Sequence, residues 1–96
     1  MTTVIVPVDF SDTSFHTARY AAQLLVGQYG VTMLLYHSYS KSAEAESAEK
    51  KLLDLKAQLT KDFIVKIEIL SHHEDDFITG LDKAVRHRRA DLLIMG

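Results

Sequence analysis

Short apolar segments alternate with helical segments along the chain, and this order restricts the fold more than any other feature. The runs at 4–8 and 31–37 are rich in aliphatic and β-branched residues, as expected of strands buried on both faces. A segment with helical spacing of its apolar residues follows each run. Strands that alternate with helices pair in parallel through right-handed crossovers. The sequence therefore predicts an α/β domain, a parallel sheet with helices on both faces.

The apolar spacing predicts three helices. The first begins at Ser11 or Asp12, because either side chain can accept a hydrogen bond from the first turn, and it ends before Gly27. The second covers 43–61, and the third covers about 75–88. The apolar residues of the third helix are expected to point inward: Phe77, Ile78, Leu81, Ala84 and Val85.

Two further strands complete the predicted sheet, which then has four. Ile64–Leu70 alternates, with Lys66 and Glu68 on one face, so we expect a strand at an edge of the sheet. Leu92–Met95 is wholly apolar, so we expect a strand covered on both faces and both edges. Because the sequence stops at this strand, we expect residues 1–96 to be a single, truncated domain.

Composition excludes several classes of function. The net charge of −2 gives no electrostatic reason to expect a nucleic acid or a membrane as partner. The chain has no cysteine, which rules out disulfides and thiolate sites. No apolar run approaches the roughly 18 residues of a membrane span, and the first residues do not form a secretory signal. We therefore expect a cytoplasmic protein.

The position of a ligand site follows from the predicted sheet. In open parallel sheets, ligands bind beyond the carboxyl ends of the strands, where the strand order reverses. The segments that follow the four strands are 7–14, 37–39, 71–75 and Gly96.

Three segments carry a resemblance to a known family. They are VIVPVDFSDTS near the start, VTMLLYHSY at 31–39 and ADLLIMG at 90–96. Together they resemble the first, second and fourth strands of universal stress proteins, and the resemblance spans all 96 residues. It implies a Rossmann-like fold of the adenine-nucleotide α-hydrolase type, whose fifth strand and last helix are absent from this sequence.

The resemblance also implies a binding site for an adenine nucleotide. Groups at the end of the first strand, at Pro7, Val8 and Asp9, would hold the adenosine. Ser38 would contact the adenine, although an apolar residue is usual there. Gly96 would be the first glycine of the phosphate-binding motif Gly-x-x-Gly-x9-Gly-[Ser/Thr]. The implied cofactor is ATP, possibly with Mg²⁺ on its phosphates, bound only by an intact domain. The implied partner is a second copy or a second stress-protein domain.

Each of these residues also has a structural interpretation. Asp9 can bond its own backbone two residues on, and Pro7 can shape the turn after the strand. Gly96 can be an ordinary loop glycine. The run His72-His-Glu-Asp-Asp76 contains metal-binding residue types, but adjacent histidines rarely face one ion and the carboxylates fit a helix cap better.

Enzyme motifs fit the sequence poorly. Asp9 and Asp12 are three residues apart, whereas the two-aspartate phosphatase loop spaces its carboxylates two apart. The third strand ends near Ser71, where a response-regulator receiver needs an aspartate. No P-loop, dinucleotide fingerprint or nucleophile elbow occurs. We therefore expect an adenine-nucleotide-binding stress-response module that is not an enzyme. The alternative is an interaction protein of the same fold that does not bind nucleotides and acts through oligomerisation.

Overall fold

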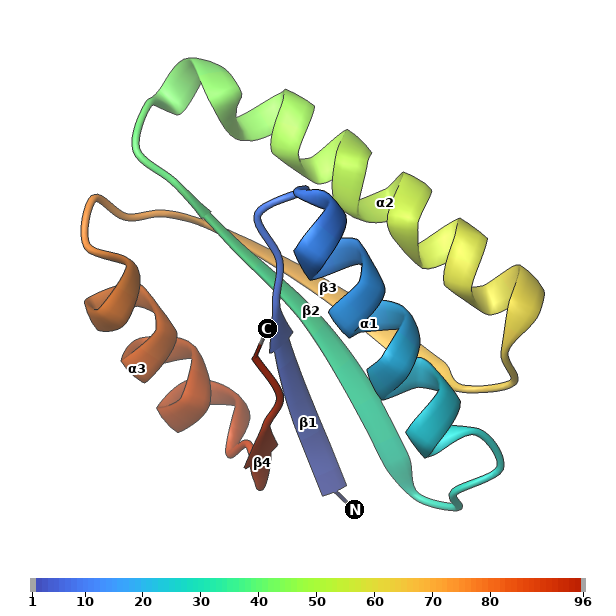
Figure 1. The fold of residues 1–96 in the computed structure, drawn as a ribbon. Coiled ribbons are helices and arrows are strands. Elements are labelled where there is room, and N and C mark those ends of the chain that lie inside the picture. Colours follow the sequence, from blue (N-terminus) through green and yellow to red (C-terminus); the bar gives the residue numbers. More distant parts are fainter. Residues whose placement is uncertain (1, 96) are drawn as a thin grey trace.

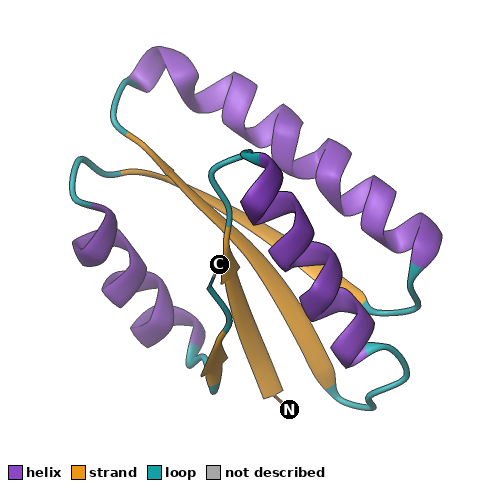
Figure 2. Ribbon diagram, in the orientation of Figure 1, coloured by secondary structure: helices purple, strands orange, loops and turns teal. Residues whose placement is uncertain are grey.

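The structure is a computed structural model that describes residues 2–95 and contains one parallel four-stranded sheet, in the order β3-β2-β1-β4 (Figures 1 and 2). The strands are β1 (Thr2–Pro7), β2 (Val31–Tyr39), β3 (Lys66–His73) and β4 (Leu92–Leu93). The helices are α1 (Asp12–Leu25), α2 (Ala45–Asp62) and α3 (Phe77–Arg88), and a short 3₁₀ turn, η1 (Ser42–Glu44), leads into α2. The predicted fold class is confirmed.

The chain winds in two directions from β1. It first passes through α1 to β2 and through α2 to β3, and both helices lie on one face of the sheet (Figure 2). It then crosses back through α3, on the opposite face, to β4 on the other side of β1 (Figure 1). The strand order therefore reverses between β1 and β4, which makes this the switch point of the sheet.

The two faces of the sheet build two cores. Side chains of alternate strand residues point to opposite faces, so Val4, Val6 and Met33 pack under α1 and α2. Their neighbours Ile5 and Leu34 pack under α3. The core beneath α1 and α2 is the larger one, because both helices contribute to it: Ala18, Ala21, Ala22, Leu52, Leu55 and Leu59.

The sequence predicted both ends of α1 correctly. Ser11 is the N-cap of α1, and its hydroxyl accepts from the N–H of Ser14 at 3.1 Å. α1 ends at Leu25, and Gly27 and Gly30 follow with a φ of 74° each, a left-handed conformation that glycine adopts readily.

Two predictions about packing were wrong. In α3, Phe77 and Ile78 do not point into the core but are 38% and 67% exposed. The buried face of this helix consists of Gly80, Leu81 and Ala84, one turn further along. On this side of the sheet, Leu81 and Ala84 join the buried cluster formed with strand residues, and Gly80 allows α3 to lie close to Tyr36.

The strand boundaries also differ. β3 is an edge strand as predicted, but it begins at Lys66 and continues to His73, because β2 extends to Tyr39 and pairs with it to the end. β4 is short, and Leu92 and Met95 are 53% and 52% exposed. The expectation that 92–95 is covered on both faces and both edges is therefore not met within residues 2–95.

Candidate functional site

A cleft of about 460 Å³ opens at the switch point, beyond the carboxyl ends of β1 and β4. The amino ends of α1 and α3 form its walls. Its lining combines hydroxyl groups, one carboxylate and two large apolar side chains, from Pro7, Asp9, Ser11, Thr13, Ser14, Phe77 and Met95. This is the place in a doubly wound sheet where a ligand is expected.

Asp9 lies two residues beyond the end of β1 and is exposed to the cleft. Its carboxylate accepts a hydrogen bond from the N–H of Ser11 at 3.0 Å, which is the two-residue turn expected of an aspartate here. Its own N–H donates to the hydroxyl of Ser14 at 3.3 Å. Asp9 therefore stabilises its own turn, as its structural interpretation predicted, and its carboxylate still lies at the cleft.

The same contacts fix the charge of Asp9. The hydroxyl and the N–H of Ser11 stabilise the ionised carboxylate, and they lower the pKa of Asp9 from 3.8 to about 2. The carboxylate is therefore negative throughout the physiological range of pH. It can accept hydrogen bonds but cannot donate one.

Phe10 adopts an unusual backbone conformation beside the cleft. Its φ is 64°, in the left-handed region that costs a non-glycine residue on the order of 1 kcal/mol. Its ring lies 4.5 Å from the ring of His37 and 5.4 Å from the Lys51 ammonium, on the far side of the turn from the cleft. Packing of Phe10 thus holds the turn that presents Asp9 and Ser11, and strain of this kind is common at binding sites.

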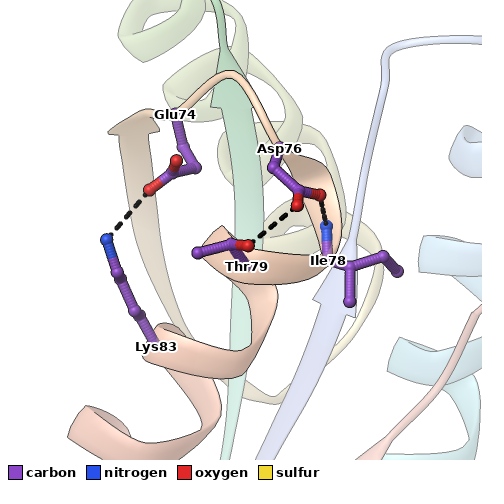
Figure 3. Close-up of polar contacts among 5 residues, drawn as sticks. All are labelled: Glu74, Asp76, Ile78, Thr79 and Lys83. Carbon is purple, nitrogen blue, oxygen red and sulfur yellow. Dashed lines mark hydrogen bonds and ion pairs between the residues drawn. The ribbon is translucent and has the colours of Figure 1, made fainter.

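The amino end of α3 supplies the opposite wall. Asp76 caps this helix, accepting from the Ile78 N–H at 3.0 Å and from the Thr79 hydroxyl at 2.8 Å (Figure 3). Lys83 binds Glu74 at 3.1 Å and ties the helix to the end of β3 (Figure 3). These contacts place Phe77 at the first position of the helix, with its side chain at the cleft rather than in the core. The cap and the ion pair therefore position this wall of the cleft.

The structure separates the residues that the resemblance assigned to one site. Pro7 and Asp9 line the cleft. Val8 is buried, its N–H donates to Tyr36 and its carbonyl accepts from Nδ1 of His37 at 2.8 Å. Ser38 lies further along β2, pairs with His72 and is not among the described lining residues of the cleft. Gly96 lies outside the described residues.

Sequence reasoning missed Phe77 and Met95 as lining residues. Both are apolar, so their pattern predicted a core position. The signal available in the sequence was the position of Met95 at the end of a predicted strand and of Phe77 at the start of a predicted helix, both at the carboxyl edge of the sheet. Thr13 lies within the candidate segment 7–14, but the sequence analysis gave it no role of its own.

The chemistry of this lining favours a neutral ligand with hydroxyl or amino groups. Asp9 supplies an ionised acceptor, and Ser11, Thr13 and Ser14 carry hydroxyls that can donate or accept. Phe77 and Met95 supply apolar surface for a flat ring. Among residues 2–95, no group of three metal-ligating side chains comes together, so the residues described do not form a metal site by themselves.

The histidines at this end of the sheet have structural partners. The ring of His37 lies 4.5 Å from the ring of Phe10 and is tilted against it by 46°, and Nε2 of His73 lies 2.9 Å from the Ser40 carbonyl. The ring of His72 meets the ring of Tyr36 edge-on at 5.7 Å. Each ring therefore contacts a neighbouring strand or turn.

Together, the fold and the cleft define a doubly wound α/β domain with a cleft at its switch point, where such folds hold their ligands. No helix within residues 2–95 has the length and apolar character needed to cross a bilayer. No protein-family model matches the sequence, and no curated protein matches it significantly.

Solved structures identify the particular version of this fold. A protein of Mycobacterium tuberculosis superposes with a TM-score of 0.79 at 22% identity, over 99% of this chain and 70% of that one. A universal stress protein in complex with cAMP gives a TM-score of 0.77 at 21% identity, over 96% and 69% of the two chains. A universal stress protein family member from Burkholderia pseudomallei gives 0.77 at 21% identity, over 99% and 80%. The chain therefore has the fold of universal stress proteins, as the sequence motifs predicted.

Proposed function

We propose that this chain is an adenine-nucleotide-binding module of the universal stress protein type, and that the nucleoside binds in the cleft at the end of β1. The observation that carries the proposal is the ionised Asp9 carboxylate at the switch point of the sheet, flanked by Ser11 and Thr13 hydroxyls. A structural neighbour is a universal stress protein in complex with cAMP, which supports an adenine nucleotide as the ligand class.

Each side chain of the cleft has a role in this proposal. Asp9 accepts hydrogen bonds from ribose hydroxyls or from the adenine amino group. Pro7 bounds the floor of the cleft at the end of β1, and Phe77 offers its ring to the base. Val8 is buried, and its backbone N–H and carbonyl form hydrogen bonds with Tyr36 and His37. Its role is therefore to hold the turn in place and not to contact the ligand. Ser38 as an adenine contact stays a prediction.

The phosphates of ATP and an accompanying Mg²⁺ are a separate part of the proposal. The described lining of the cleft carries no cation to meet a phosphate, and Asp9 is its single carboxylate. Magnesium would therefore arrive bound to the phosphates rather than to a preformed protein site. Gly96, the predicted first glycine of the phosphate loop, lies outside the described residues and stays a prediction.

Binding, rather than catalysis, is the proposed activity. In the described lining of the cleft no side chain pairs a nucleophile with a base: the Ser14 hydroxyl donates to the Ser11 carbonyl at 3.1 Å, and Asp9 is engaged by Ser11. A bound nucleotide would instead bias the state of a partner or of a second domain.

Equilibrium titration tests the proposal. We expect a fluorescent adenosine derivative to bind the 96-residue chain saturably, and unlabelled adenosine to displace it. Thr13→Val removes a lining hydroxyl and should weaken binding, whereas the exposed Thr60→Val, on α2 and away from this cleft, should not. Absence of saturable binding by the folded chain would refute the function.

A second candidate is an interaction module that acts through oligomerisation. The observation in its favour is the outer edge of β4, where Leu92, Leu93 and Met95 are exposed and no further described strand pairs. An exposed apolar edge strand readily pairs with another chain. The two candidates differ in a simple way, since the second predicts association that does not respond to adenosine.

A further inference from the structure

We infer that the cleft selects the uncharged nucleoside over its phosphorylated forms, so that adenosine binds more tightly than AMP. The inference rests on the proposed function, and it specifies which part of the ligand the cleft recognises. It follows from the charges around the cleft, from the state of the α1 amino end and from the hydrogen-bonding character of the lining.

The charges around the cleft are negative. Asp9 is the ionised side chain in the described lining, and Asp12 adds a second carboxylate in the first turn of α1. No lysine, arginine or histidine belongs to that lining. A phosphate within a few ångströms of Asp9 would meet two like charges and no described counter-charge, which weakens its binding.

The nearby cations are engaged elsewhere. The Lys51 ammonium lies over the Phe10 ring at 5.4 Å, and Lys83 is paired with Glu74 at 3.1 Å. Arg19 on α1 binds Asp62 of α2 at 2.9 Å. To reach a phosphate in the cleft, each of these side chains would first have to break the contact that it makes.

The amino end of α1 is also poorly suited to an anion. Helix amino ends attract phosphates through free N–H groups and a positive dipole end. Here the N–H of Ser14 is already bound to the Ser11 hydroxyl, and the N–H of Ser11 is bound to Asp9. Asp12 in the first turn places a negative charge where the dipole is positive. One N–H of the first turn is therefore already occupied, and the charge of Asp12 offsets part of the attraction that the helix dipole offers a phosphate.

The hydrogen-bonding groups and the apolar side chains of the lining, by contrast, suit a nucleoside. Ribose hydroxyls donate hydrogen bonds, and an ionised carboxylate is the strongest acceptor that a side chain provides. The hydroxyls of Ser11 and Thr13 can take either role, and Phe77 and Met95 offer apolar contact to the base. Adenosine satisfies all of these groups without bringing a negative charge beside Asp9.

The test compares two ligands at two ionic strengths. We titrate the 96-residue chain with adenosine and with AMP by calorimetry, without divalent cations, at 50 mM and at 300 mM NaCl. At low salt we expect AMP to bind about three- to tenfold more weakly than adenosine. Salt screens charge repulsion, so the gap should narrow at 300 mM through tighter binding of AMP, with adenosine unchanged.

Two variants assign the effect to one carboxylate. Asp9→Asn removes the charge but keeps an oxygen that can accept from the Ser11 N–H, so the turn is preserved. We expect the ratio of the AMP to the adenosine dissociation constant to fall toward one in this variant. Asp54→Asn is the matched control, because it removes an exposed carboxylate on α2 that does not line the cleft. It should change the ratio by less than twofold.

The outcomes separate the inference from the function beneath it. If AMP binds more tightly than adenosine at low salt, or if Asp9→Asn leaves the ratio unchanged, the inference is overturned while nucleoside binding stands. If the folded chain binds neither ligand, the proposed function is overturned and the inference with it. Circular dichroism spectra of both variants, compared with the unmodified chain, confirm that the fold is retained.

Discussion

Gly80 lies in the middle of α3, against the buried side chain of Tyr36 on β2. A methyl group at Gly80 would lie closer to the Tyr36 hydroxyl oxygen than real side-chain contacts allow, and 2.9 Å from Cγ of Glu74. Tyr36 is 0% exposed and cannot turn away into solvent. Gly80→Ala therefore forces α3 away from the sheet.

The change in stability caused by Gly80→Ala is the sum of two opposing free-energy contributions. Alanine is favoured over glycine in a helix interior by about 1 kcal/mol. Overpacking a filled core costs about 1–3 kcal/mol. Because Tyr36 is fixed by the sheet and only the Glu74 side chain can move aside, we expect the upper part of this cost, about 2–3 kcal/mol. Gly80→Ala should therefore lower the free energy of unfolding by about 1–2 kcal/mol. Urea unfolding followed by circular dichroism measures this as a lower midpoint at unchanged slope.

Tyr36→Phe provides the control and the rescue. The Tyr36 hydroxyl is buried without a hydrogen-bond partner in the described part of the chain, and burial raises its pKa. An unpaired buried hydroxyl is costly, so Tyr36→Phe alone should be neutral or stabilising. In the double variant the clash with the hydroxyl oxygen is gone and only the flexible Glu74 side chain has to move, so we expect a coupling of at least about 1 kcal/mol. A Gly80→Ala chain as stable as the unmodified one, or additive variants, would refute the packing argument.

Three further predictions concern the site and its surroundings. The pKa of Asp9 is about 2 in the folded chain instead of 3.8, so its contribution to stability is present above about pH 4 and is lost as the pH falls toward 2. Urea midpoints measured across this range should therefore fall less steeply for Asp9→Ala than for the unmodified chain. Arg89 ends α3 with a φ of 51°, so Arg89→Gly should stabilise the fold by about 0.5–1 kcal/mol in thermal unfolding, and a loss of stability would contradict this. If the β4 edge associates, Leu93→Lys should lower the sedimentation coefficient at high concentration, and a strictly monomeric unmodified chain would refute association.

Local patterns in the sequence were sufficient for the architecture. The apolar runs and helical spacing predicted the four strands and the three α-helices but not the 3₁₀ turn η1, and the polar face of 64–70 predicted the edge position of β3. Ser11 and Gly27 predicted the ends of α1. These features depend on neighbours within a few residues, so the sequence displays their causes directly. The motif at Pro7–Asp9 also indicated where the cleft begins.

The composition of the cleft was decided by the tertiary structure alone. Phe77 and Met95 meet Asp9 because the crossover through α3 brings the chain back beside β1, more than sixty residues later. The pattern of α3 predicted Phe77 in the core, but Gly80 and Leu81 are the residues buried against that face of the sheet, and Phe77 lies at the cleft. Periodicity tells which residues share a face of a helix. Which part of that face is buried depends on the shape of the surface opposite, and this exists only when the sheet has formed.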